Sequence, residues 1–173
     1  MQKLFNFFGI NIALKSSKSN FNKMFQKSFF FLLFTFMLFS CISTKSTLMN
    51  VDNNAPIPKL TKQNTFLLTE ISTDAKYGYD KNYPVNVFFR NSNDEEINCN
   101  RFLNALSGPN SEVITFKKTG ICCPFPSKNI NTGGGFLAVY EINYEGLKNP
   151  KILYLNIYER GLLMAPIGFT IKK

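Results

Sequence analysis

FLAVYEINYEGLKNPKILYLNIY, residues 136–158, carries the clearest structural pattern in this sequence of 173 residues. In its first half apolar and polar residues alternate, as in a half-buried strand. The residues on the apolar face are Phe136, Ala138, Tyr140, Ile142 and Tyr144. Residues 151–158 are apolar on both faces, which indicates a central strand. The short connections predict an antiparallel three-strand meander completed by residues 162–171, in which Pro166 marks an edge or a bulge.

Three upstream segments have β-compatible sequences. Residues 66–71 are mostly apolar, residues 84–90 alternate, and residues 113–117 follow a Gly-Pro-Asn-Ser turn. Counting these with the meander, we expect one antiparallel sheet of five to six strands.

One short helix is predicted between the second and third of these segments. Cys99, Phe102, Leu103 and Leu106 have the i, i+3, i+4, i+7 spacing of a buried helix face. The acidic run 94–96 suits a helix N-terminus, and Gly108-Pro109 is expected to end the helix. The expected fold class is therefore mainly β to α+β.

The amino-terminal region has the architecture of a signal peptide. An apolar run over residues 29–39, interrupted only by Thr35, follows Lys27. Because a spanning helix needs about 20 apolar residues, this run is too short to cross a bilayer comfortably. We expect residues 1–40 to be a signal peptide, with Met24 as an alternative start.

Leu38-Phe39-Ser40-Cys41 closes this run and resembles the lipobox of bacterial lipoproteins. The resemblance implies cleavage before Cys41 and attachment of lipid to its thiol, so that the chain is held at a membrane by its N-terminal lipid. An uncleaved signal anchor with an incidental cysteine is the alternative. Ile42 stands where an Asp would retain a lipoprotein in the inner membrane, which favours the outer membrane. The absence of an acidic cluster after Cys41 favours its periplasmic side.

Residues 41–64 are rich in Ser, Thr, Asn, Lys and Pro, which is typical of a flexible tether. The remaining residues, 65–173, have the length of one domain, and we expect a single β-rich domain there.

Charge and composition exclude several classes of function. The net charge of +9 falls to +4 after residue 41, where fifteen basic residues face eleven acidic ones, so we do not expect nucleic acid as a partner. Histidine is absent, which excludes serine-histidine-carboxylate triads and HExxH zinc sites. We assign no catalytic residue, no cofactor and no metal.

The three cysteines of the domain are Cys99, Cys122 and Cys123. In an oxidising compartment, a disulfide from Cys99 to Cys122 or Cys123 would close a loop of about 24 residues and leave one thiol over. The alternative is that Cys99 is a small apolar residue on the buried helix face. A metal site is disfavoured because adjacent cysteines point apart in a strand.

Other residues are candidates for chemistry or binding. An enzyme here would use carboxylates such as Glu70, Glu141 or Glu145, or a thiol at Cys122 or Cys123. Gly133-Gly134-Gly135 lacks phosphate-loop spacing and is interpreted as a turn. The tyrosines could stack on a sugar ring or partner, although packing over the sheet is favoured; they are Tyr77, Tyr79 and Tyr83.

Four motifs resemble a group of small uncharacterised lipoproteins from one branch of Gram-negative bacteria. They are Tyr77-Gly78-Tyr79-Asp80 with Pro84, RFLNAL (101–106) with Gly108-Pro109-Asn110, Cys122-Cys123-Pro124-Phe125, and Val139-Tyr140-Glu141 with Tyr144-Glu145-Gly146. The resemblance covers most of residues 60–173. Some members carry the name 2-dehydro-3-deoxyphosphooctonate aldolase, an enzyme with a (β/α)8 barrel. Such a barrel takes about 250 residues, and roughly 110 follow the tether here.

The sequence therefore predicts a lipid-anchored envelope lipoprotein with a non-enzymatic binding or structural role, whose partner is an envelope protein or a glycan. An enzyme is the alternative.

Overall fold

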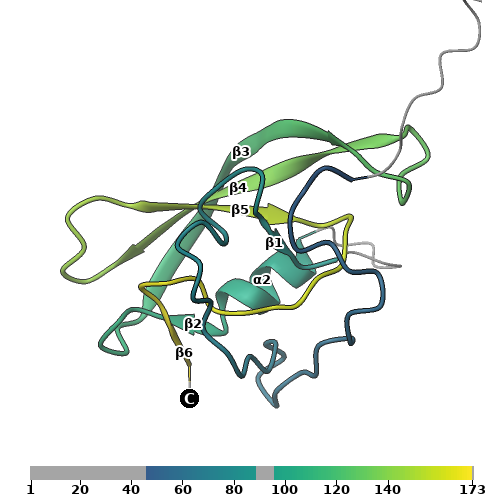
Figure 1. The fold of residues 1–173 in the computed structure, drawn as a ribbon. Coiled ribbons are helices and arrows are strands. Elements are labelled where there is room, and N and C mark those ends of the chain that lie inside the picture. The colour runs from purple at the N-terminus through teal and green to yellow at the C-terminus, as the bar shows by residue number, and fades with distance from the viewer. Residues whose placement is uncertain (1–45, 89–95, 173) are drawn as a thin grey trace, which may run out of the picture. The chain divides into compact units, whose positions relative to one another are not determined.

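A computed structural model of the chain describes residues 46–88 and 96–172 (Figure 1). The expected signal peptide over residues 1–40, the lipidation candidate Cys41 and the acidic pair Asp94-Glu95 lie outside these ranges. Within the described ranges, no helix is both long enough and apolar enough to cross a membrane.

The main sheet has four strands in the order β1-β5-β4-β3. Their bounds are Val85–Asn86 for β1, Ile114–Pro126 for β3, Gly134–Tyr144 for β4 and Lys151–Asn156 for β5. β3, β4 and β5 are antiparallel neighbours, whereas β1 pairs with β5 in parallel. The central position predicted for residues 151–158 is therefore found for β5, which ends two residues earlier than predicted.

A second sheet corrects the prediction of one sheet of five to six strands. β2 (Leu106–Ser107) pairs antiparallel with β6 (Thr170–Ile171) as a separate two-stranded sheet. Residues 162–169 do not continue the meander, because Pro166 cannot donate a ladder hydrogen bond and Gly168, at φ +85°, reverses the chain. The coarser prediction is confirmed: the described chain is mostly β with one helix. It lacks the alternation of strands and helices that a (β/α)8 barrel needs.

The antiparallel meander exists, but it is formed by β3, β4 and β5. The predicted strand 113–117 extends to Pro126 because two register shifts, between Lys118 and Gly120 and between Cys122 and Phe125, let β3 stay paired with β4. Such bulges add a residue to one strand and bend it. The residues after Lys117, which the sequence pattern left outside the predicted strand, therefore lie within β3.

The one helix within the described ranges, α2, spans Ile97–Leu103 and buries Cys99, Phe102 and Leu103. The helix was predicted to end at Gly108-Pro109, but it ends at Leu103, five residues before Gly108. Leu106 is buried as its spacing predicted, but it belongs to β2, where pairing with Ile171 replaces another turn of helix. Tertiary pairing thus overrides the local helical pattern.

The segment 66–71 is not a strand, although its alternation is real. Phe66 and Leu68 are buried and Leu67 is half exposed, yet the segment forms only isolated bridges, from Phe66 to Leu60 and from Ile71 to Ala165. An extended loop that packs on a core alternates in the same way as a strand. Periodicity alone therefore could not tell the two apart.

Part of the expected tether packs on the domain. Met49 N donates to Asn82 O at 2.8 Å, Asp52 N donates to Arg160 O at 2.7 Å, and Ala55 is buried. We call residues 49–55 the strap. The backbone N–H groups of Met49 and Asp52 in the strap thus have partners in the part of the chain that follows residue 65.

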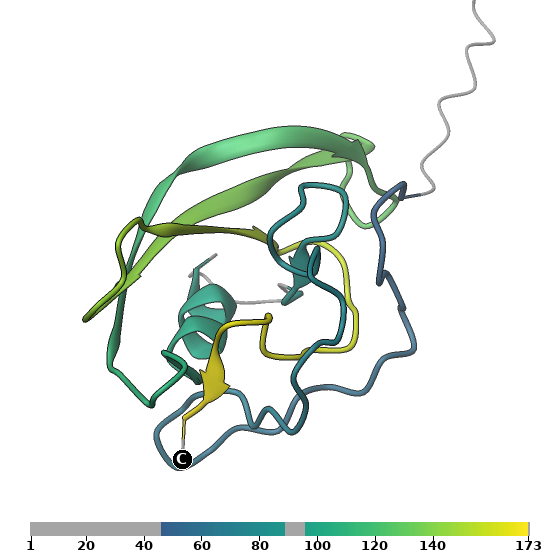
Figure 2. The ribbon, with the colours of Figure 1, turned by 60° about the vertical axis from the view of Figure 1, so that its left-hand side comes forward.

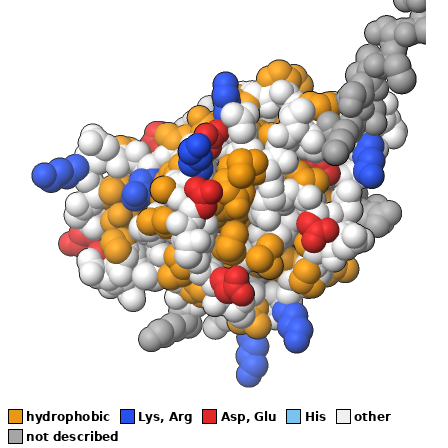
Figure 3. Space-filling view, in the orientation of Figure 1, with side chains coloured by type: hydrophobic (Ala, Val, Ile, Leu, Met, Phe, Trp, Pro, Cys, Tyr) orange, Lys and Arg blue, Asp and Glu red, His pale blue; other side chains and the backbone are white. Residues whose placement is uncertain are grey.

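The core lies between the inner face of the sheet and the helix. In Figure 2 the sheet arches over α2. The fully buried side chains include Tyr77, Val85, Phe102, Leu103, Tyr140, Ile142, Leu153 and Leu155. Several apolar residues of β3, β4 and β5 are exposed, among them Ile121, Phe136 and Ile152. Figure 3 shows a band of hydrophobic side chains flanked by charged ones. Of the residues on the predicted buried face, Phe136 is 49% exposed, whereas Ala138, Tyr140 and Ile142 are buried as predicted.

Candidate functional site

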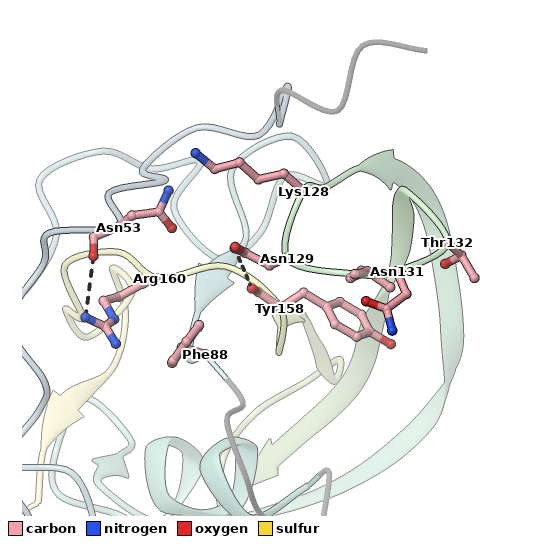
Figure 4. A pocket seen from close by; sticks show the side chains of 9 residues that line it. Asn53, Phe88, Lys128, Asn129, Asn131, Thr132, Tyr158 and Arg160 are labelled. Carbon is pink, nitrogen blue, oxygen red and sulfur yellow. Dashed lines mark hydrogen bonds between the residues drawn. The ribbon is translucent and has the colours of Figure 1, made fainter. Parts of the chain in front are cut away.

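A polar groove of about 680 Å³ opens beside the end of β5 (Figure 4). Its walls come from four parts of the chain: the strap, the residues that follow β1, the residues that follow β5, and the loop between β3 and β4. The lining residues are Asn53, Phe88, Lys128, Asn129, Ile130, Asn131, Thr132, Tyr158 and Arg160. In Figure 4 Asn53 and Arg160 lie on one side and Tyr158, Asn131 and Thr132 on the other, with Phe88 between them. The groove is large enough for a ligand of several rings.

The β3–β4 loop, residues 127–133, forms one wall and is held at both ends. We call it the groove loop. Ser127 N donates to Gly133 O at 3.0 Å across the base of the loop. In its middle, the Asn129 amide donates to Tyr158 O at 3.1 Å and to the carboxylate of Glu159 at 2.7 Å. The loop is thereby tied to the chain that leaves β5.

The aromatic part of the wall depends on a glycine. A Cβ at Gly135 would lie 2.6 Å from Ile130 Cδ1 and 2.7 Å from the Tyr158 ring, so only glycine lets both side chains pack on β4. The Tyr158 ring also packs against Phe125, with ring centroids 6.3 Å apart. Of the triple glycine interpreted as a turn, Gly133 (φ +78°) lies in the turn, whereas Gly134 and Gly135 lie in β4.

The opposite wall is built around Arg160. Its guanidinium lies over the ring of Phe88, 4.6 Å from the centroid, and Nη1 donates to the carbonyls of Asn53 at 3.4 Å and Ala55 at 3.5 Å. A bridge between Val87 and Arg160 holds this strand end in place. Stacking on the Phe88 ring holds the plane of the guanidinium in place. The N–H donors of Arg160 then point outward along the edge of the guanidinium.

The described residues that line the groove carry positive charge. Lys128 and Arg160 are the cations among the described lining residues, and no carboxylate is among those residues. Glu159 is nearby but buried, with its carboxylate directed to Asn129. Amide groups, a hydroxyl, an aromatic ring and two cations together can bind a polar ligand that carries negative charge.

The disulfide in the structure differs from the predicted pairing. Cys122 is bonded to Cys123, whereas Cys99 is buried on α2 and takes no part in a disulfide. Adjacent cysteines were expected to point apart. Cys123 has φ +60° in a bulge of β3, which breaks the alternation of the strand and brings the two sulfurs together. Within the described ranges, no three cysteines or acidic residues gather closely enough to hold a metal ion.

The candidate catalytic carboxylates do not line the groove. Glu141 lies opposite Lys117 on the neighbouring strand, 3.6 Å from its Nζ, and Glu145 and Glu70 are exposed. Each position is typical of a solvated surface charge.

The tyrosines of the 77–83 loop pack rather than face the groove. Tyr77 is fully buried, donates to Leu162 O at 3.3 Å and meets Tyr83 edge to face at 5.3 Å. Tyr79 donates to Ile167 O at 2.7 Å. Burial raises the pKa of Tyr79 to about 12 and raises that of Tyr77 well above its ordinary value, so both hydroxyls stay protonated at neutral pH.

The groove residues were not singled out in the sequence. The run Lys128-Asn-Ile-Asn-Thr132 before three glycines marks a polar loop, and Arg160-Gly161 marks a turn. Neither signal shows that the two turns meet, because β4 and β5 lie between them in the sequence.

No family model, curated protein or solved structure matches this chain.

Proposed function

We propose that this protein is a lipid-anchored binding protein of the cell envelope whose groove takes an acidic glycan. The groove carries the proposal: its lining combines amides, an aromatic wall and two cations, with no carboxylate among the described residues that line it. The anchor is inferred from the apolar run 29–39 and from Leu38-Phe39-Ser40-Cys41. The outer membrane, on its periplasmic side, is the proposed location.

The ligand class follows from the side chains. Asn and Thr side chains bond hydroxyl groups in both directions, which suits the hydroxyls of sugar rings. An aromatic ring such as that of Tyr158 gives an apolar surface to the face of a sugar. Lys128 and Arg160 favour a carboxylate, phosphate or sulfate on that sugar. An uncharged glycan would leave both cations without an anionic partner.

Lys128→Ala should weaken binding of a hexuronic-acid trisaccharide about tenfold, because one charge-assisted hydrogen bond is lost. A neutral hexose trisaccharide should be affected by less than about twofold. Calorimetric titration of both sugars checks this. Lys62→Ala is the matched control, since it removes an equal charge from an exposed position that does not line the groove. Equal losses in the two variants, or no binding of the acidic sugar to the unmodified protein, would contradict the proposed ligand.

Cys41→Ala should abolish incorporation of radiolabelled palmitate, because it removes the thiol that would carry the lipid. Intact-mass measurement of the membrane-extracted protein gives the start of the mature chain. Cys99→Ala, which removes another cysteine, should stay labelled. An unmodified chain that retains residues 24–40 would contradict the anchor and indicate an uncleaved membrane segment.

A further inference from the structure

The disulfide between Cys122 and Cys123 lies in the strand that leads into the groove loop. Residues 125 and 126 pair with Gly135 and Gly134, and the loop begins at residue 127. The bulge between Cys122 and Phe125 sets the register of this last pairing. The conformation of the Cys122-Cys123 pair therefore determines how β3 enters the groove wall.

A bond between neighbouring residues does little for global stability. A disulfide stabilises a fold mainly by closing a long loop in the unfolded chain, and here the sequence separation is one residue. Its effect is local. It holds Cys123 at φ +60°, a left-handed conformation that residues other than glycine rarely adopt.

The bond is also within reach of a reductant. Both cysteines are half buried, and their neighbours Ile121 and Pro124 are exposed. Thiol–disulfide exchange needs such access, because the attacking thiolate must approach one sulfur along the S–S axis. A buried structural disulfide would not offer this approach.

We propose that Cys122 and Cys123 form a reversible redox site that controls the conformation of the groove loop. The co-reactant is an external dithiol, such as a dithiol protein. Its thiolate attacks one Sγ, the S–S bond breaks, and the electron pair leaves on the other Sγ, which takes a proton. The second thiol of the reductant then resolves the mixed disulfide. Two electrons and two protons reach Cys122 and Cys123, and the reductant leaves as its own disulfide.

Reduction frees Cys123 to leave the left-handed region. The pairing of residues 125 and 126 with β4 then loses the fixed bulge that sets its register. The groove loop, which carries Lys128 and Asn129, should loosen while β5 stays in place. The redox assignment itself does not depend on the proposed ligand; only its consequence for glycan affinity rests on the proposed function.

The test uses the folded protein treated with dithiothreitol, then alkylated without unfolding. We expect two alkyl groups, on Cys122 and Cys123, and their loss of reactivity after reoxidation. Hydrogen exchange over residues 127–133 should quicken about tenfold on reduction, with residues 151–156 unchanged. The variant with both Cys122→Ser and Cys123→Ser should match the reduced state, and Cys99→Ala should still respond to dithiol.

The proposal is overturned by a folded protein that takes up no label after reduction. It is also overturned by labelling without faster exchange at residues 127–133, or by equal loosening of residues 151–156. Trisaccharide titration in both redox states separates the two proposals. If the sugar binds neither state while exchange responds to dithiol, the proposed ligand fails and the redox site stands.

Discussion

Asn156→Ala should lower the free energy of unfolding by about 2 to 4 kcal/mol, because it leaves buried polar groups without partners. The Asn156 amide donates to Asn86 Oδ1 at 2.9 Å, and its oxygen accepts from Tyr158 N at 3.0 Å. Both asparagine side chains are buried, at 1% exposure for Asn86 and 0% for Asn156. Asn86 in turn donates to the carbonyls of Asn50 at 2.7 Å and Met49 at 3.2 Å. One substitution thus interrupts a chain of bonds from β5 to the strap.

Urea unfolding followed by circular dichroism measures this loss. Asn143→Ala is the control, because Asn143 is exposed on the adjacent strand and should cost no more than about 0.5 kcal/mol. The double variant Asn86→Ala with Asn156→Ala should lower the free energy of unfolding by less than the sum of the two single variants. Each single substitution leaves the other asparagine buried without its hydrogen-bond partner, and the double variant does not. Strict additivity, or a loss as small as that of Asn143→Ala, would show that the pair does not act as a unit.

The sequence predicted the elements whose patterns are local. Alternation over residues 136–144 and the two-faced apolar run at residues 151–158 predicted β4 and β5, and the spacing of Cys99, Phe102 and Leu103 predicted α2. Ala138, Tyr140 and Ile142 in β4 and Cys99, Phe102 and Leu103 in α2 are buried as their periods predict, whereas Phe136 is exposed. The number of sheets could not be predicted in the same way, because β2 and β6 are two residues long and are defined only by each other.

The candidate site was missed for a related reason. The groove joins residues from positions 53, 88, 128–132, 158 and 160, and none of these short stretches has a motif of its own. The vicinal disulfide was missed because strand geometry separates adjacent side chains, and the bulge that overrides this rule depends on pairing with β4. Glu141, a sequence candidate, is an ordinary cross-strand partner of Lys117.

Gly161→Ala should detach the strap and destabilise the fold by about 2 to 3 kcal/mol, as overpacking in a closed site does. A Cβ at Gly161 would lie 2.0 Å from Asn50 O, a backbone atom that cannot turn aside. Moving the strap would stretch the bonds from Asp52 N to Arg160 O, now 2.7 Å, and from Asn50 Nδ2 to Leu162 O, now 2.9 Å.

The matched control is Gly120→Ala, where an added Cβ meets nothing within 4 Å, so that stability should be unchanged or rise by about 0.5 kcal/mol. Hydrogen exchange at residues 49–55, together with urea unfolding, measures both variants. Equal stability and equal protection in the two would mean that the strap is not held by its contact with Gly161. If the strap does detach, Arg160 loses the carbonyls of Asn53 and Ala55, and the groove loses one wall. Affinity for the acidic trisaccharide should then fall even though Lys128 is intact, which ties the ligand site to the amino-terminal segment that the sequence alone assigned to a tether.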